Sequence, residues 1–223
     1  MTDCPQGAWL AANLESELQK PEFSNFIRPW VMRSWLGTEP FERLIHLWVA
    51  FNAWTAETIT PSDLMERDAA LVAAASRDPE LNRRFSFLFD NDTEFQKLAI
   101  EFRCLWPVFN VRRLDQDNVE PWQQEIYSRK EYRQMCFDAG ASKHDMKPGC
   151  FLRHQNGEET VTGGDPDRVP LDWPHTLSAI YQVRCNLFHG GKSFRMPSDV
   201  RFAELAFEIL WACWGSEFVD AQH

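Results

Sequence analysis

Apolar side chains recur at helical spacing along residues 39–58, and this pattern constrains the fold more than any other feature of the chain. They follow the i, i+3, i+4, i+7 rule that places them on one face of a helix: Phe41, Leu44, Ile45, Trp48 and Phe51. Thr38 is a suitable N-cap, and Pro40 suits an early helical position. Strand patterns are scarce, whereas the helical spacing recurs in residues 62–76, 79–89, 92–106, 172–188 and 198–213. We therefore predict an all-α fold built as a helical bundle.

The length of 223 residues suits one large domain, because no segment with the composition of a linker divides the chain. We expect a single helical domain over residues 1–223. Residues 1–36 are expected to form an N-terminal arm that is irregular around Pro29. Gly and Pro concentrate in residues 115–170, so we expect a loop-rich insertion there, with its most irregular part at about 139–170.

Three features of the sequence bear on the compartment. The chain has no stretch of roughly 20 apolar residues such as a membrane helix needs. Its N-terminus lacks the basic start and apolar run of a secretory signal. The 6 Cys are scattered and form no Cys-x-x-Cys pair, as is typical of reduced thiols. We therefore expect a soluble, cytoplasmic protein without a membrane partner.

The formal net charge is -10, which argues against a protein that coats nucleic acid non-specifically. Two segments are nevertheless locally basic. Residues 128–154 carry six Lys and Arg against three acids. In residues 184–201, Asp199 is the one acid among four basic side chains, which are Arg184, Lys192, Arg195 and Arg201. A local site for an anion is therefore compatible with the overall charge.

The segment 172–188 carries a basic residue within an apolar helical stripe. Its stripe consists of Leu177, Ile180, Tyr181, Arg184, Leu187 and Phe188. A guanidinium keeps its charge, so burial of Arg184 requires an acidic or phosphate partner. His189 follows five residues later and, at ~100° per residue, points about 140° away from Arg184, whereas it shares a face with Asn186. A twofold dimer would reconcile these directions, because each copy could supply an Arg, an Asn and a His to a composite cleft.

These residues carry a resemblance to a known family. The run Tyr-Gln-Val-Arg-Cys-Asn-Leu-Phe-His-Gly-Gly-Lys at 181–192 resembles the Arg-x4–6-His motif of HEPN domains, in the form that has Asn inside the motif and Gly-Gly-Lys after it. Residues 47–53 also resemble an earlier helix of Apea-like HEPN proteins. The resemblance implies an α-helical, usually dimeric domain. Many members are metal-independent endoribonucleases in toxin, antiphage or RNA-processing settings, while others have lost catalysis. Some relatives are modified by a nucleotidyltransferase on a Tyr two residues after the His, where this chain has Gly191.

The resulting hypothesis is an endoribonuclease of the HEPN type that needs no metal or cofactor. RNA carries its own nucleophile, the 2′-OH, and the product would have a 2′,3′-cyclic phosphate end. His189 suits acid or base work near neutral pH, and Arg184 suits the phosphate. Asn186 would orient the phosphate or the imidazole. Lys192, Arg195 and Asn52 are candidate substrate-binding residues. The expected partners are RNA, a second copy of the chain, and an antitoxin or another component of a defence system.

Several residues allow a second reading. Asn52 interrupts the apolar face of residues 39–58, and it either hydrogen-bonds within the core or reaches the cleft near Arg184. Arg184 could instead pair with an acid such as Glu208 and serve only the fold, with His189 as a helix cap. The chain would then be a non-catalytic module that binds nucleic acid, nucleotides or another protein.

Two further groups of residues have a simpler expected role. Four possible zinc ligands have a spacing that matches no strong zinc-finger pattern, so we read them as scattered loop residues: Cys136, His144, Cys150 and His154. Glu42 and His46 lie four residues apart on the polar side of their helix and are expected to form a solvated surface pair.

Overall fold

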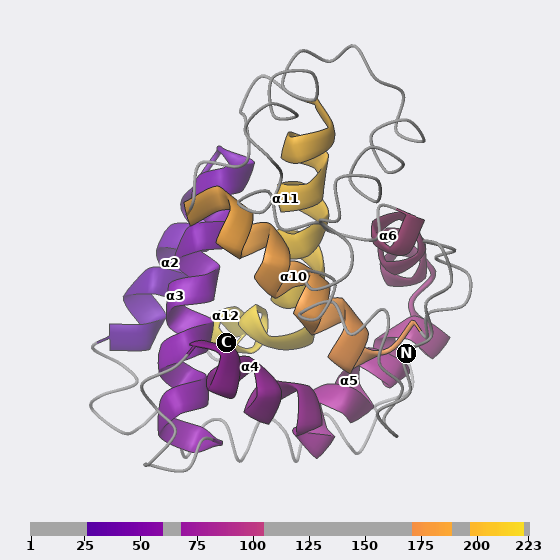
Figure 1. Ribbon diagram of the computed structural model, residues 1–223, viewed down its shortest axis with the longest axis horizontal. Helices are drawn as coiled ribbons and strands as arrows, with labels where there is room; N and C mark the ends of the chain where they lie inside the picture. Colours follow the sequence, from indigo (N-terminus) through magenta and orange to yellow (C-terminus); the bar gives the residue numbers. More distant parts are fainter. Residues whose placement is uncertain (1–25, 60–67, 105–170, 189–196, 221–223) are drawn as a thin grey trace, which may run out of the picture.

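A computed structural model describes four stretches of the chain, and within them it contains helices and no strand (Figure 1). These stretches are residues 26–59, 68–104, 171–188 and 197–220. The prediction of an all-α fold is therefore confirmed for the part of the chain that the structure describes. The expected insertion at 115–170 and the first 25 residues lie outside it.

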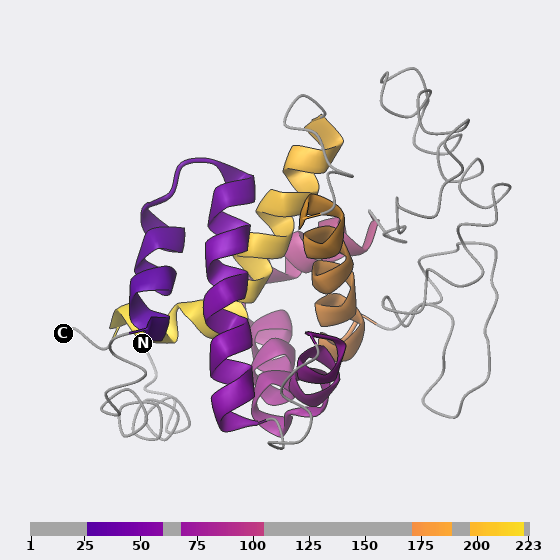
Figure 2. The same cartoon turned by 60° about the vertical axis from the view of Figure 1, so that its left-hand side comes forward.

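Helix α3, Pro40–Thr58, is the central helix of the bundle. It ends at the predicted residue and begins one residue after the predicted start, because Glu39 and not Thr38 is its N-cap, without a capping hydrogen bond from the side chain. Pro40 lies in the first turn, where a missing backbone N–H costs nothing. Its apolar stripe is buried, including Leu44, Trp48 and Phe51. Helix α2, Arg28–Leu36, packs against one side of α3, and helix α11, Pro197–Leu210, packs against the other side (Figures 1 and 2).

Helix α2, Arg28–Leu36, corrects one prediction from the sequence. The stretch around Pro29 is a regular helix and not an irregular arm. Pro29 lies in the first turn, so its ring removes no helical hydrogen bond. The helix turns back antiparallel onto α3 through a short connection (Figure 2).

Three shorter helices follow α3: α4, Asp68–Arg77; α5, Pro79–Asn91; and α6, Thr93–Cys104. An aspartate caps each of the last two. Asp78 accepts hydrogen bonds from the backbone N–H groups of Glu80 and Leu81, and Asp92 does the same for the start of α6. The predicted starts of α5 and α6 are thus confirmed, whereas residues 62–67 of the predicted second helix lie outside the described part.

Helix α10, Trp173–Phe188, carries the Arg184 segment and matches the predicted range 172–188. Asp172 caps it by accepting from the backbone N–H of His175 at 3.0 Å. The indole N–H of Trp173 donates to the carbonyl of Ala75 at 2.9 Å, which ties the start of α10 to α4. This tie holds the start of α10 against α4 (Figure 1). Arg184 lies near the other end of α10.

Aromatic rings form the centre of the core. The ring of Phe51 lies within 5.3 to 6.5 Å of four indole rings, those of Trp48, Trp54, Trp173 and Trp214. These rings come from α3, α10 and the C-terminal segment, so a single cluster joins three parts of the chain. The four tryptophans of this cluster are therefore core residues.

The end of α11 departs from a regular helix. Residues Trp211–Gly215 form a π-helical turn, η4, in which the N–H of Ser216 donates to the carbonyl of Trp211 at 2.9 Å. A short helix, α12, follows at Glu217–Asp220. A Cβ at Gly215 would lie 2.8 Å from the Trp211 ring and 2.9 Å from Leu47, so only glycine fits this close approach without a shift of its neighbours.

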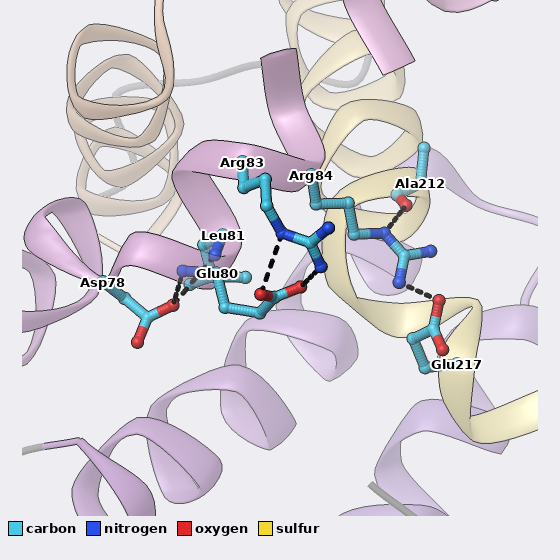
Figure 3. A network of polar contacts seen from close by, with 7 residues as sticks. All are labelled: Asp78, Glu80, Leu81, Arg83, Arg84, Ala212 and Glu217. Carbon is cyan, nitrogen blue, oxygen red and sulfur yellow. Dashed lines mark hydrogen bonds and ion pairs between the residues drawn. The ribbon is translucent and has the colours of Figure 1, made fainter. Parts of the chain in front are cut away.

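Arg84 of α5 holds this C-terminal turn in place (Figure 3). Its Nε donates to the carbonyl of Ala212 at 3.0 Å, and its Nη2 donates to the hydroxyl of Ser216 at 2.9 Å. Its Nη1 forms an ion pair with the carboxylate of Glu217. One guanidinium thus satisfies a carbonyl, a hydroxyl and a carboxylate that all belong to the segment after α11.

Among the described residues, none of the helices combines the length and the apolar character that crossing a bilayer requires.

His46 of α3 differs from the expected surface residue. Its side chain is 14% exposed, and its ring lies 5.4 Å from that of Trp30. Burial lowers the pKa of His46; Arg33 acts in the same direction, whereas the carboxylate of Glu42, 3.8 Å away, opposes the shift. The expectation of a solvated pair is therefore wrong for His46, although Glu42 itself is exposed.

We expect Arg84→Met to lower the free energy of unfolding by about 2 kcal/mol, because it leaves the Glu217 carboxylate and the Ala212 carbonyl without this donor. The neighbouring Arg83 is a matched control, since it pairs on the same helix with Glu80 and both side chains are at least 33% exposed (Figure 3). Arg83→Met should cost less than about 0.5 kcal/mol. Urea denaturation of the three proteins measures both effects, and equal losses would contradict the role given to Arg84.

We expect the protein to lose stability as the pH falls from 7.5 toward 5.5, in part through His46. A base whose pKa is lowered by folding binds fewer protons in the folded state than in the unfolded state. Its contribution to the free energy of unfolding is therefore fully present above its usual pKa and is lost at lower pH, as the unfolded chain takes up protons. In His46→Gln this part of the pH dependence should disappear. Denaturation at the two pH values measures it, and an unchanged difference between them would count against the assignment.

Candidate functional site

Arg184 lies in the last turn but one of α10, with a side chain that is only 18% exposed. Its guanidinium carbon is 4.3 Å from the ring centroid of Phe188 and 6.0 Å from that of Trp48. Phe188 is half exposed and Trp48 is buried. The cation therefore lies between a core ring and a surface ring, where the π faces attract it but do not neutralise its charge.

Asp68 provides the counter-charge. Arg184 Nη1 lies 2.7 Å from Asp68 Oδ2, and the side-chain amide of Asn52 donates to Asp68 Oδ1 over 3.3 Å. Three helices meet at this carboxylate: α10 supplies the cation, α3 the amide and α4 the acid. The acid is the more open partner, with 37% of its side chain exposed.

The suggestion that Glu208 pairs with Arg184 is therefore wrong. Glu208 forms its ion pair with Arg43 of α3, at 3.3 Å. Arg43 lies in turn over the ring of Phe207, 3.8 Å from the ring centroid. Among the residues that the structure describes, this group resembles the one at Arg184, since each has an arginine, a carboxylate and an aromatic ring, but it lies outside the motif at 181–192.

Asn52 lies beside the partner of Arg184, which is the second of the two positions that the sequence allows. Its Nδ2 contacts the same carboxylate as the guanidinium, and its Oδ1 is buried without a hydrogen-bond partner among the described residues. Arg184 Nε is also buried and has no such partner there. Two donors that converge on one carboxylate form a set that suits any oxyanion of similar size.

Tyr181 and Cys185 complete the surroundings of the ion pair. The Sγ of Cys185 lies 3.9 Å from Arg184 Nη1, and the Tyr181 ring stacks on Trp48 with centroids 5.8 Å apart. Burial raises the pKa of Tyr181 to about 12, and Cys185 and Asp68 act in the same direction. The phenol is therefore neutral near pH 7, and Asp68 is the residue whose negative charge balances the charge of Arg184.

Asn186, expected as a catalytic residue, lies elsewhere on α10. It is 3% exposed, and its Oδ1 accepts a hydrogen bond from Gln182 Nε2 at 3.0 Å. Two positions along a helix correspond to about 200°, so Asn186 and Arg184 project from opposite sides of α10. In this conformation the Asn186 side chain belongs to the core.

The remaining candidate residues lie outside the described part of the chain. These are His189, Lys192 and Arg195, together with the possible zinc ligands Cys136, His144, Cys150 and His154. Within the described ranges, no group of three or more His, Cys, Asp or Glu side chains could hold a metal ion.

Asp68 is the residue of this site that the sequence does not reveal. The sequence predicts that Arg184 needs an anionic partner, and it places residue 68 in a helix. Which of the acids meets the guanidinium depends on how α4 packs against α10, and one sequence holds no signal for such a distant pair.

Comparison of the chain with family models, with curated proteins and with solved structures found no match. The resemblance of residues 181–192 to HEPN domains therefore stays a prediction from the sequence.

We expect Arg184→Met to change the free energy of unfolding by less than about 1 kcal/mol, because the partly exposed Asp68 carboxylate can turn to water and Met retains the apolar stem. Arg84→Met, which removes an arginine with a buried structural role, is the comparison. A loss of stability as large as that of Arg84→Met would show that Arg184 serves mainly the fold. Both values come from the same denaturation experiment.

Proposed function

We propose that this chain is a metal-independent endoribonuclease of the HEPN type in which Arg184 binds the scissile phosphate and His189 moves the protons. The observation that carries the proposal is the convergence of Arg184 and Asn52 on one partly exposed carboxylate. Such a pair of donors suits a phosphate as well as it suits a carboxylate. The sequence adds an imidazole five residues after the arginine.

The proposed reaction uses the 2′-OH of RNA as its nucleophile. A base takes the proton of the 2′-OH, and the 2′ oxygen attacks the neighbouring phosphorus. The bond from phosphorus to the 5′ oxygen breaks, and that oxygen receives a proton from an acid. The products are a 2′,3′-cyclic phosphate and a 5′-OH end. His189 is the proposed base or acid, because imidazole exchanges protons near neutral pH.

Arg184 suits the phosphate of this reaction for two physical reasons. Its charge does not depend on pH, and its planar fork can donate two hydrogen bonds to neighbouring oxygens. Partial burial between Phe188 and Trp48 strengthens its interaction with charge that develops as the phosphorane forms.

The proposed active form is a twofold dimer. In a continuing helix, His189 would point about 140° away from Arg184, so a second copy is the simplest source of an imidazole for each arginine. Phe188 leaves half of its ring exposed just before His189, as a residue of an interface would. A toxin or antiphage protein held inactive by a partner is the proposed setting.

A specific observation favours the second candidate, a non-catalytic module that binds nucleic acid or nucleotides. Arg184 already holds Asp68, and Asn186 is buried. Both candidates require an anion at Arg184, but only the enzyme requires His189. The test of function therefore measures cleavage and binding separately.

We expect the purified protein to cut RNA in the presence of EDTA and to leave 2′,3′-cyclic phosphate ends. Arg184→Met and His189→Ala should each slow cleavage by about 100-fold or more, because each removes a group that acts on the reacting phosphate or its protons. Arg43→Met is the matched control, since it removes the arginine of the comparable pair with Glu208, and it should cut at close to the parent rate.

Mixing the two inactive variants tests the composite site. A heterodimer of Arg184→Met and His189→Ala has one intact site of its two, so an equal mixture should recover about a quarter of the parent activity. Cleavage by His189→Ala at the parent rate would refute the role of the imidazole, and RNA that binds tightly without being cut would favour the non-catalytic module.

A further inference from the structure

We infer that Asp68 occupies the place that a substrate phosphate takes on Arg184 and Asn52, so that RNA binds only by displacing this carboxylate. The inference rests on the proposed function, since it names the residue with which the substrate competes at the proposed site. It assigns Asp68 as the residue that sets how strongly the site binds an oxyanion.

The contacts of the carboxylate support this assignment. Each oxygen of Asp68 has one of the two donors, with Arg184 Nη1 at 2.7 Å and Asn52 Nδ2 at 3.3 Å. Two adjacent oxygens of a phosphate are spaced much like the two oxygens of a carboxylate, so each can accept a hydrogen bond from one of the same two donors. A phosphate can therefore replace the carboxylate without a new donor.

The exposure of the pair indicates which partner can leave. Asp68 is 37% exposed, about twice the 18% of Arg184. The guanidinium is held between Phe188 and Trp48, with the Cys185 thiol beside it. Asp68 lies at the first described turn of α4, so its side chain can rotate into water while the arginine stays in place.

Charge makes the two anions exclusive. While Asp68 stays on Arg184, the pair is neutral, and a phosphate brought to the same donors would meet a like charge at contact distance. A phosphodiester carries one negative charge, as the carboxylate does. Replacing the carboxylate by the phosphate on Arg184 therefore adds little binding free energy by itself. The protein would then bind RNA through contacts around this site and hold isolated phosphate weakly.

The pair of Arg43 and Glu208 offers a matched comparison. Its carboxylate is 39% exposed, close to the 37% of Asp68, and its arginine also lies over a phenylalanine ring. Asp68→Asn and Glu208→Gln therefore each remove one negative charge from a similar environment. Any general effect of net charge on RNA binding is the same in both variants.

The test measures binding of an RNA oligonucleotide with 2′-O-methyl groups, which lacks the 2′-OH nucleophile and cannot be cut. We expect Asp68→Asn to bind it about tenfold more tightly than the parent, because a like charge no longer opposes the phosphate. Glu208→Gln should stay within about twofold of the parent, and so should Asp68→Glu, which keeps a competing carboxylate. Fluorescence anisotropy at fixed salt gives the Kd values, and thermal melts confirm that each variant folds.

The outcomes separate this inference from the proposed function. A gain in Asp68→Asn that vanishes when Arg184→Met is added upholds the inference, whether or not the parent cuts RNA. Equal affinities of Asp68→Asn and Glu208→Gln overturn the inference even if the parent is an active ribonuclease, and so does weaker binding by Asp68→Asn. If no variant binds the oligonucleotide, the inference is also overturned.

Discussion

The ion pair between Arg184 and Asp68 is the interaction on which this account depends. A guanidinium keeps its charge inside a protein, so an arginine on the apolar stripe of α10 requires an anion. The fold supplies Asp68 from α4 and adds the amide of Asn52 from α3. Because that carboxylate remains partly exposed, the same donors that complete the fold can also serve a ligand. A fully buried partner would have made the arginine a structural residue alone.

The rest of the structure fixes the three helices that meet at this carboxylate. Phe51 and the surrounding indoles join α3 to α10 and to the C-terminal segment, and Trp173 ties the start of α10 to Ala75 of α4. Arg84 performs a different task, because it binds the π-helical turn and α12 to α5 through three groups. The two arginines therefore differ in kind: Arg84 is satisfied entirely by the fold, while Arg184 retains a buried Nε without a partner in the described part of the chain.

Much of this fold follows from local patterns, and the exceptions have physical causes. The bounds of α3 and α10 are predictable, because the signals that set them lie close by in the sequence. Pro40 marks the start of α3, and Asp172 caps the start of α10. The helix at α2 is missed when Pro29 is read as a breaker, although a proline in a first turn breaks nothing. The turn η4 depends on Arg84, which is distant in the sequence. The same limit applies to the site: the need of Arg184 for an anion is predictable, but the identity of Asp68 depends on packing.

The most direct test of the central claim is a crystal structure of the protein with a 2′-O-methylated RNA bound. We expect a phosphate oxygen within hydrogen-bond distance of the Arg184 guanidinium, and we expect the Asp68 carboxylate to have turned away from the guanidinium into solvent. A complex in which Asp68 still holds Arg184 and Asn52, with every phosphate bound elsewhere, would contradict this claim.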